Sequence, residues 1–234
     1  MTAPTISRRS LLVATASSGF AGFALRANGK DEKESEVTAN EDLMREHGVI
    51  RRALFVYQEA GRRARKDPAS IPLPGLLDTA KLFRQFAEDY HERALEETHI
   101  FPVVRKLKGP VSQLPDVLLT QHKRGREITD YVSRVAAERR VGATESERLA
   151  STLDALVSMY GPHAAREDTV LFPAWKAALG AKSYDEMGDK FEDLERKMLG
   201  PDGFEDALKR IASIEQDFGL RDLSTVTAAP PPTV

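Results

Sequence analysis

Cysteine is absent from the 234 residues of this chain. Without cysteine the chain can form no disulfide and no iron–sulfur cluster, and it offers no thiolate to zinc. Any bound metal must therefore be held by histidine, carboxylate or water, a set of ligands that suits iron or manganese better than soft ions.

A strong net charge is also absent. The chain has 34 Lys and Arg residues against 36 Asp and Glu residues, which gives a formal net charge of −2. This balance favours neither nucleic acid nor a strongly anionic partner. Convincing strand-type alternation of apolar and polar residues is absent as well, so the core is expected to be helical.

Apolar residues recur at helical spacing in four long stretches, about 41–66, 76–107, 116–140 and 146–179. Proline and glycine interrupt the pattern between them, most clearly at Gly109-Pro110 and around Gly142. Four helices with short connections predict an all-α fold, an antiparallel up-down-up-down four-helix bundle over residues 41–180.

The N-terminus has the features of an export signal. Arg8-Arg9 precedes an uncharged, mostly apolar run to Leu25, and small residues follow where cleavage is expected, as at Ala27. We interpret residues 1–27 as a twin-arginine-type signal peptide, with a retained anchor as the alternative. The apolar run is short for a membrane span. The mature protein is therefore expected in the periplasm or outside the cell, with no membrane span.

The remaining segments flank the bundle. Residues 28–40 are polar and charged and are interpreted as a linker. Residues 181–219 contain two shorter helical patterns, near 184–198 and 204–218, and are expected to form a C-terminal helical extension. The proline-rich end, residues 220–234, is expected to be a disordered tail.

Two segments of the bundle, 90–102 and 160–173, follow one plan. In each, a His precedes a Glu by about one helical turn and a Phe-Pro pair closes the segment: His91 and Glu96 in the first, His163 and Glu167 in the second. Side chains one turn apart lie on the same face of a helix. Two such pairs facing each other could hold two metal ions with bridging carboxylates.

The first and third helices also repeat each other. His47 is followed four residues later by Arg51, and His122 is followed four residues later by Arg126. In an antiparallel bundle, His47, His91, His122 and His163 would lie at the same level along the bundle axis to within a turn or two of helix. Each helix would then contribute one His to the same layer. Each Arg either pairs with a carboxylate of the site or is a surface charge.

Together these residues resemble the hemerythrin-like family, the His-His-Glu cation-binding domains, over roughly residues 41–180. Members of this family are antiparallel four-helix bundles that hold a non-haem diiron centre with bridging carboxylates. The resemblance implies two iron ions, with manganese as the alternative metal, and Glu96 and Glu167 as the bridges. The implied ligands are His47, His91, Glu96, His122, His163 and Glu167.

Two departures from the family pattern concern the carboxylates. The second helix has Leu95 where the family has Glu four residues after the His, and Glu96 comes fifth. A π-bulge would absorb the extra residue and restore the geometry, and Glu92 and Glu97 are alternative ligands. In the fourth helix Asp168 directly follows Glu167, and either carboxylate could bridge.

A third departure concerns the third helix. Oxygen-carrying hemerythrins have a second His four residues after the first, and here Arg126 occupies that position. An imidazole is lost and a cation is gained, which should change iron coordination and argues against reversible oxygen carriage.

The fifth His of the chain, His99, forms the pattern Glu-x-x-His with Glu96. Ferritin-like diiron bundles use this pattern twice. Because Val170 stands at the matching place after Glu167, we reject a ferritin-like centre. His99 is then either an additional or outer ligand or an ordinary interior residue. A core role is expected for Trp175, Phe55 and Phe86.

These features predict an exported non-haem diiron protein that binds or senses dioxygen or a related small oxidant. One alternative is a diiron oxidoreductase that acts on peroxide or nitric oxide. Others are an iron-binding or storage protein and a metal-free helical interaction protein. The sequence specifies neither a redox partner nor an oligomeric state.

Overall fold

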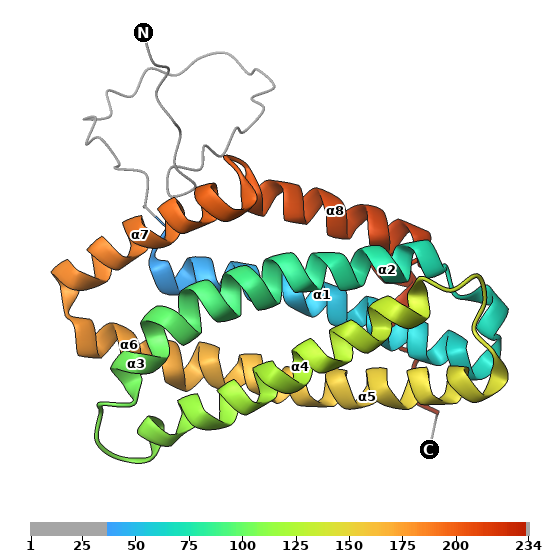
Figure 1. Cartoon of the computed structure of the whole chain (residues 1–234), viewed down its shortest axis with the longest axis horizontal. Helices are drawn as coiled ribbons and strands as arrows, with labels where there is room; N and C mark the ends of the chain where they lie inside the picture. Colours follow the sequence, from blue (N-terminus) through green and yellow to red (C-terminus); the bar gives the residue numbers. More distant parts are fainter. Residues whose placement is uncertain (1–36, 233–234) are drawn as a thin grey trace, which may run out of the picture.

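The structure, a computed structural model, describes residues 37–232, and all regular elements in this range are helical (Figure 1). The expected signal peptide, residues 1–27, and most of the expected linker lie outside the described residues. Within residues 37–232, no helix combines the length and the apolar character that crossing a bilayer requires.

Four long helical arms make up the bundle. Three short 3-10 turns also occur, η1 (Pro68–Ser70), η3 (Pro110–Gln113) and η5 (Leu223–Val226). The arms are α1 (Ala39–Lys66), then α2 (Leu73–Leu82) with η2 (Phe83–Ile100) and α3 (Phe101–Val104), then α4 (Leu114–Ala136), then α5 (Ala143–Arg166) with η4 (Glu167–Leu171) and α6 (Phe172–Leu179). These match the four predicted stretches, although the second arm ends at Val104 and the third at Ala136, a few residues earlier than predicted.

The arms contact one another in a ring. Helix α1 packs against α5 and α2, and α4 packs against α2, η2 and α5. The interior is filled by aromatic and aliphatic side chains, among them Tyr57, Phe83, Leu153 and Leu156, each at most 1% exposed. The apolar side of each arm therefore faces a single shared core.

The start of α1 is fixed by a capping box. The Thr38 hydroxyl accepts a hydrogen bond from the Glu41 amide (3.4 Å), and the Glu41 carboxylate accepts one from the Thr38 amide (3.3 Å). These two bonds satisfy amides that the first turn of a helix otherwise leaves unpaired. They set where α1 begins, and so the level at which His47 enters the bundle.

Two further helices, α7 (Ala181–Leu199) and α8 (Gly203–Asp217), cover one side of the bundle (Figure 1). Helix α7 contacts α1, η2 and α6, and α8 contacts α1 and α2. Phe191 of α7 stacks on Trp175 with ring centroids 5.6 Å apart and the planes 3° apart. The extension therefore covers the α1–η2 face, whereas the sequence left open whether it packs on the bundle or on a partner.

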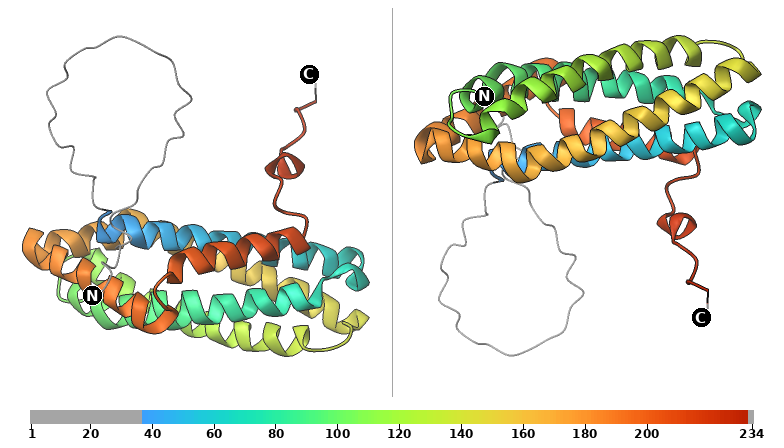
Figure 2. Two further views of the ribbon diagram at one scale, coloured as in Figure 1. Left: turned by 90° about the horizontal axis from the view of Figure 1, so that it is seen from above. Right: turned by 90° about the horizontal axis from the view of Figure 1, so that it is seen from below.

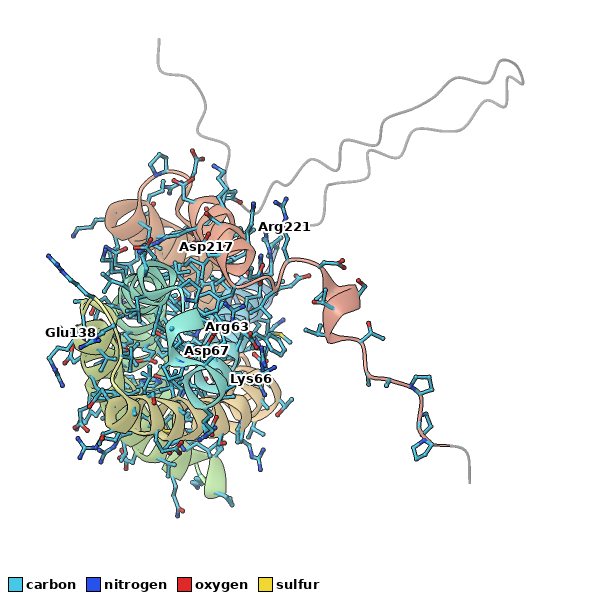
Figure 3. All side chains as sticks on the ribbon, turned by 90° about the vertical axis from the view of Figure 1, so that its right-hand side faces the viewer. Arg63, Lys66, Asp67, Glu138, Asp217 and Arg221 are labelled. Atoms are coloured by element: carbon cyan, nitrogen blue, oxygen red, sulfur yellow. The ribbon has the colours of Figure 1, made fainter. Side chains whose placement is uncertain are left out.

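Arg63 holds together the end of the bundle where α1 finishes (Figure 3). Its guanidinium donates to the carbonyl of Ser70 (3.0 Å) and to that of Phe218 (2.7 Å), and lies over the Phe218 ring. This joins α1 to the end of α8. From here the exposed residues 221–232, which include the turn η5, run away from the helices (Figure 2).

One core assignment is wrong. Trp175 and Phe86 are buried as predicted, but Phe55 is 62% exposed. Its neighbours Leu54 and Val56 face the core, and Phe55 lies on the outer side of α1, where it lines a surface groove with Leu223 and Val226. The physical reason is that a helix buries a stripe of its surface, and a single apolar residue beside that stripe can remain in solvent.

Candidate metal centre

Each of the four arms contributes one buried His to a common layer. His47 and His91 meet with their Nε2 atoms 3.0 Å apart, and His122 and His163 meet with theirs 3.2 Å apart. All four side chains are at most 4% exposed. We call His47 and His91 the α1/η2 pair, and His122 and His163 the α4/α5 pair.

Two glutamates lie between these pairs, and each directs one oxygen to each pair. Glu96 places Oε1 3.4 Å from the Nε2 of His91 and Oε2 3.4 Å from the Nε2 of His122. Glu167 places Oε2 3.5 Å from the Nε2 of His47 and Oε1 3.0 Å from the Nε2 of His163. Both carboxylates therefore have the arrangement of a bridge between two ions.

The donor atoms converge in three groups, each within 4.8 Å. Two lie in the central layer, His47 with His91 and Glu96, and Glu96 with His122, His163 and Glu167, and the third, Glu92 with Glu97 and His122, lies on the Nδ1 side of His122. All four carboxylate oxygens of Glu96 and Glu167 are buried without a hydrogen-bond partner. Buried carboxylates are normally paired or bound to metal. Two imidazoles with a carboxylate are typical of non-haem iron sites, so these residues fit cations.

The Nδ1 atom of each ring has a partner outside the centre. The acceptors are Asp168 for His47 (2.6 Å), Glu46 for His91 (2.6 Å), Glu97 for His122 (2.9 Å) and Gln121 for His163 (2.8 Å). An acceptor at Nδ1 favours the tautomer with its proton there, which leaves the Nε2 lone pair free for a metal. The outer partners thus fix both the orientation and the protonation of the four rings.

Arg51 and Arg126 act on these outer carboxylates and not on the bridges. Arg51 pairs with Asp168, while Arg126 pairs with Glu97 and also reaches Glu92 Oε2 at 3.2 Å. Burial alone raises the pKa of Glu97, but hydrogen bonds from His122 and Arg126 lower that pKa to about 2. Burial alone raises the pKa of Asp168, but His47 and then Arg51 lower it below its usual value, so both carboxylates that orient these imidazoles are held in the charged form.

The pKa values of two central groups shift in opposite directions. Burial alone raises the pKa of Glu167, but His163 and His47 lower it well below its usual value. Burial alone lowers the pKa of His91, but Glu96 and Glu46 raise it well above its usual value. The cluster therefore carries strongly interacting charges, as expected for groups that share cations.

The second arm is π-helical through the ligand region. The Phe101 amide donates to the carbonyl of Glu96, five residues earlier, and π hydrogen bonding extends over η2. Because the turns of a π-helix are wider, His91 and Glu96 share a face although five residues separate them, and Leu95 turns into the apolar core. The predicted π geometry is present, but it spans 18 residues and not a single turn.

The four alternative ligands lie outside the central layer. Glu97 and Asp168 bind the outer nitrogens of His122 and His47. Glu92 accepts a hydrogen bond from the Tyr160 hydroxyl (2.6 Å), and with Glu97 it flanks His122 on its Nδ1 side. His99 is half-buried beside Phe191, and burial and Lys190 lower its pKa.

Sequence reasoning missed Glu46 and Gln121 as outer partners and Gly125 as a contact of the site. A Cβ built on Gly125 would lie 2.1 Å from the Tyr160 hydroxyl oxygen, so only glycine leaves room for that hydroxyl beside α4. A signal for the first two was present. Glu46 and Gln121 each directly precede the His of the repeated first and third helices.

Comparison with known proteins agrees with this centre. Two relatives are the uncharacterized protein Rv1995 of Mycobacterium tuberculosis and the uncharacterized protein Mb2018 of Mycobacterium bovis. Each is 42% identical over 205 residues, which covers 86% of this chain and 78% of the relative. No solved structure matches the chain significantly. Residues 38–175 match the hemerythrin HHE cation binding domain. With its buried cluster of His and Glu, the chain is a metal-binding protein that belongs to the hemerythrin HHE cation-binding domain family.

Proposed function

We propose that this chain is an exported non-haem diiron protein that binds or senses dioxygen or a related small oxidant. The observation that carries the diiron part is the position of Glu96 and Glu167, each with one unpaired oxygen toward each His pair. A single ion would need only one pair and one oxygen of each carboxylate. Two ions account for all four imidazoles and all four carboxylate oxygens.

The residues of the chain divide into three roles in this proposal. The central His and Glu side chains bind, the outer carboxylates and Gln121 orient the rings, and the aromatic residues Phe101 and Phe172, which stack on His122 and His47, exclude water. Bound iron would supply one-electron redox chemistry and coordination positions open to a small ligand. With two imidazoles and two carboxylate oxygens for each ion, the donor set supports such open positions.

The presence of Arg126 in place of a further imidazole supports ligand sensing or turnover over reversible carriage. Arg126 is committed to Glu97 and Glu92, so it adds no donor to the α4/α5 pair. One alternative is a diiron oxidoreductase acting on peroxide or nitric oxide. It is favoured by the Tyr160 hydroxyl and the Glu92 carboxylate, which form a hydrogen bond beside this pair. Iron storage is less well supported, because the buried donor atoms suit a fixed number of ions.

Export rests on the Arg8-Arg9 signal, which lies outside the described residues. Expression of the full chain with the twin Arg changed to twin Lys should retain the protein in the cytoplasm. Unchanged export of that variant would contradict a twin-arginine route.

The first test is the metal content of the purified protein together with its absorption spectrum, before and after azide is added under air. We expect close to two irons per chain and an azide-sensitive visible absorption. His163→Ala should lose the azide-sensitive absorption and one of the two irons, whereas His99→Ala, which changes the His outside the cluster, should keep the absorption and both irons. Iron well below one ion per chain in the unaltered protein would refute the diiron proposal. If the protein holds two irons, an assay of hydrogen peroxide consumption distinguishes the two functions. Consumption would indicate an oxidoreductase, and its absence a binding or sensing protein.

A further inference from the structure

The internal repeat differs at one position that touches the centre. Glu46 precedes His47 in the first helix, and Gln121 precedes His122 at the same place in the third helix. Each reaches across to the ligand of a neighbouring arm: Glu46 Oε2 lies 2.6 Å from Nδ1 of His91, and Gln121 Oε1 lies 2.8 Å from Nδ1 of His163. The same contact is thus made by a carboxylate in the half that holds the α1/η2 pair and by a neutral amide in the half that holds the α4/α5 pair.

The remaining outer contacts of the two halves are matched. Asp168 with Arg51 holds His47, and Glu97 with Arg126 holds His122, so each half has one carboxylate neutralised by one Arg. Glu92 also lies near the second half, but its carboxylate is 3.9 Å from the Nδ1 of His122 and shares Arg126. The difference between Glu46 and Gln121 therefore gives the α1/η2 pair two carboxylates in hydrogen-bond contact with Nδ1 atoms, whereas the α4/α5 pair has one.

Burial differs between the halves in the same direction. Glu46 is 1% exposed and also accepts a hydrogen bond from the Tyr90 hydroxyl (2.9 Å). Gln121, by contrast, is only partly buried on α4. A carboxylate in the drier environment acts more strongly on its imidazole than an amide near solvent, because low local dielectric strengthens charged hydrogen bonds.

We propose that the centre is asymmetric, with the metal position of His47 and His91 binding its ion more tightly than the position of His122 and His163. A carboxylate that accepts from Nδ1 raises the basicity of a ligand imidazole, and removal of such outer partners typically lowers metal affinity about 10–100-fold. The α4/α5 position is then the one at which metal exchanges. This inference rests on the proposed two-metal centre.

The test is a titration of the metal-free full chain with Mn²⁺, with free Mn²⁺ followed by electron paramagnetic resonance. We expect two steps, one ion each, separated about 10–100-fold in dissociation constant. Gln121→Glu should tighten the weaker step, and Glu46→Gln should weaken the tighter step. Gln58→Glu, on the exposed side of α1 about three turns from His47, adds the same charge remotely and should change neither step.

The identity of the tighter position is read from ligand variants. His163→Ala should keep one tightly bound ion, and His91→Ala should keep one weakly bound ion. In the double variant Glu46→Gln/Gln121→Glu this order should reverse. Two ions that bind with equal affinity, or an order that the double variant leaves unchanged, would overturn the asymmetry while the two-metal centre stands. Less than one ion per chain would overturn both proposals.

Discussion

The close approach between Gly125 and Tyr160 gives a sharp test of how the site is packed. In Gly125→Ala the new Cβ would lie 2.1 Å from the hydroxyl oxygen and 3.0 Å from the ring carbon that bears it. The ring cannot swing away freely, because it packs edge-on against Phe83 and against the ring of His163. We therefore expect strain in α4 together with displacement of the hydroxyl from Glu92.

The magnitude follows from three contributions. Overpacking in a core costs about 1–3 kcal/mol. Loss of the Tyr160–Glu92 hydrogen bond leaves a buried acceptor unpaired, at about 1–3 kcal/mol. Replacing a helical Gly with Ala contributes about 1 kcal/mol in the opposite direction. The net loss of unfolding free energy is roughly 3 kcal/mol, or about 6–12 °C in Tm for a chain of this size.

The assay is thermal unfolding followed by circular dichroism, with Gly161→Ala as the matched control. Gly161 is also helical, and a Cβ there meets nothing within 4 Å, so this variant should be as stable as the unaltered protein or slightly more stable. Adding Tyr160→Phe to Gly125→Ala removes the closest contact and should recover part of the loss. If Gly125→Ala and Gly161→Ala melt at the same temperature, the packing argument is wrong.

Three further predictions concern metal and charge. Removal of metal by a chelator should lower Tm. The expected loss is about 8–16 °C for one ion whose free concentration is about 1,000 times its Kd. Equal Tm values with and without metal would contradict a site built into the fold. Burial raises the pKa of Glu88 to about 7 from 4.5, so its contribution to stability is complete below pH 4.5 and lost as pH rises through 7. The difference in unfolding free energy between Glu88→Gln and the unaltered protein, measured with urea, should therefore shift in favour of the variant by up to about 3 kcal/mol from pH 4 to pH 8. A difference that does not change with pH would refute this. Arg126→Gln leaves Glu97 without its cation and should raise the metal dissociation constant about 10-fold with helicity unchanged, whereas the exposed Arg124→Gln should have no effect.

The sequence predicted the four arms and the convergence of their His residues because both follow from helical periodicity. Positions such as His163 and Glu167 are one turn apart whatever the rest of the fold does, so their shared face could be read directly. The outer partners could not be predicted in this way. Glu46 binds the His of another arm, so its role depends on how two helices are aligned relative to each other, which the pattern within one helix does not contain.

Two other features could not be predicted from the periodicity of apolar residues, for different reasons. The outward position of Phe55 depends on which side of α1 the neighbouring arms cover, and an aromatic residue beside an apolar stripe is compatible with either side. The length of η2 depends on tertiary packing, since the sequence called for only one extra residue to be absorbed near Glu96. The expected export signal remains a prediction.

The π-helical arm has a consequence for how this chain can vary in length. An ordinary α-helix transmits the insertion or deletion of one residue to every position beyond it, as a rotation of about 100°. In η2 the wider turns absorb the extra residue between His91 and Glu96, and the regular turns of α3 resume at Phe101. We expect that deleting Leu95 would convert the spacing to that of His163 and Glu167 without moving either side chain to another face. Such an arm should accommodate single-residue changes in length beside His91 and Glu96, a kind of change that most helices in a packed core do not accommodate.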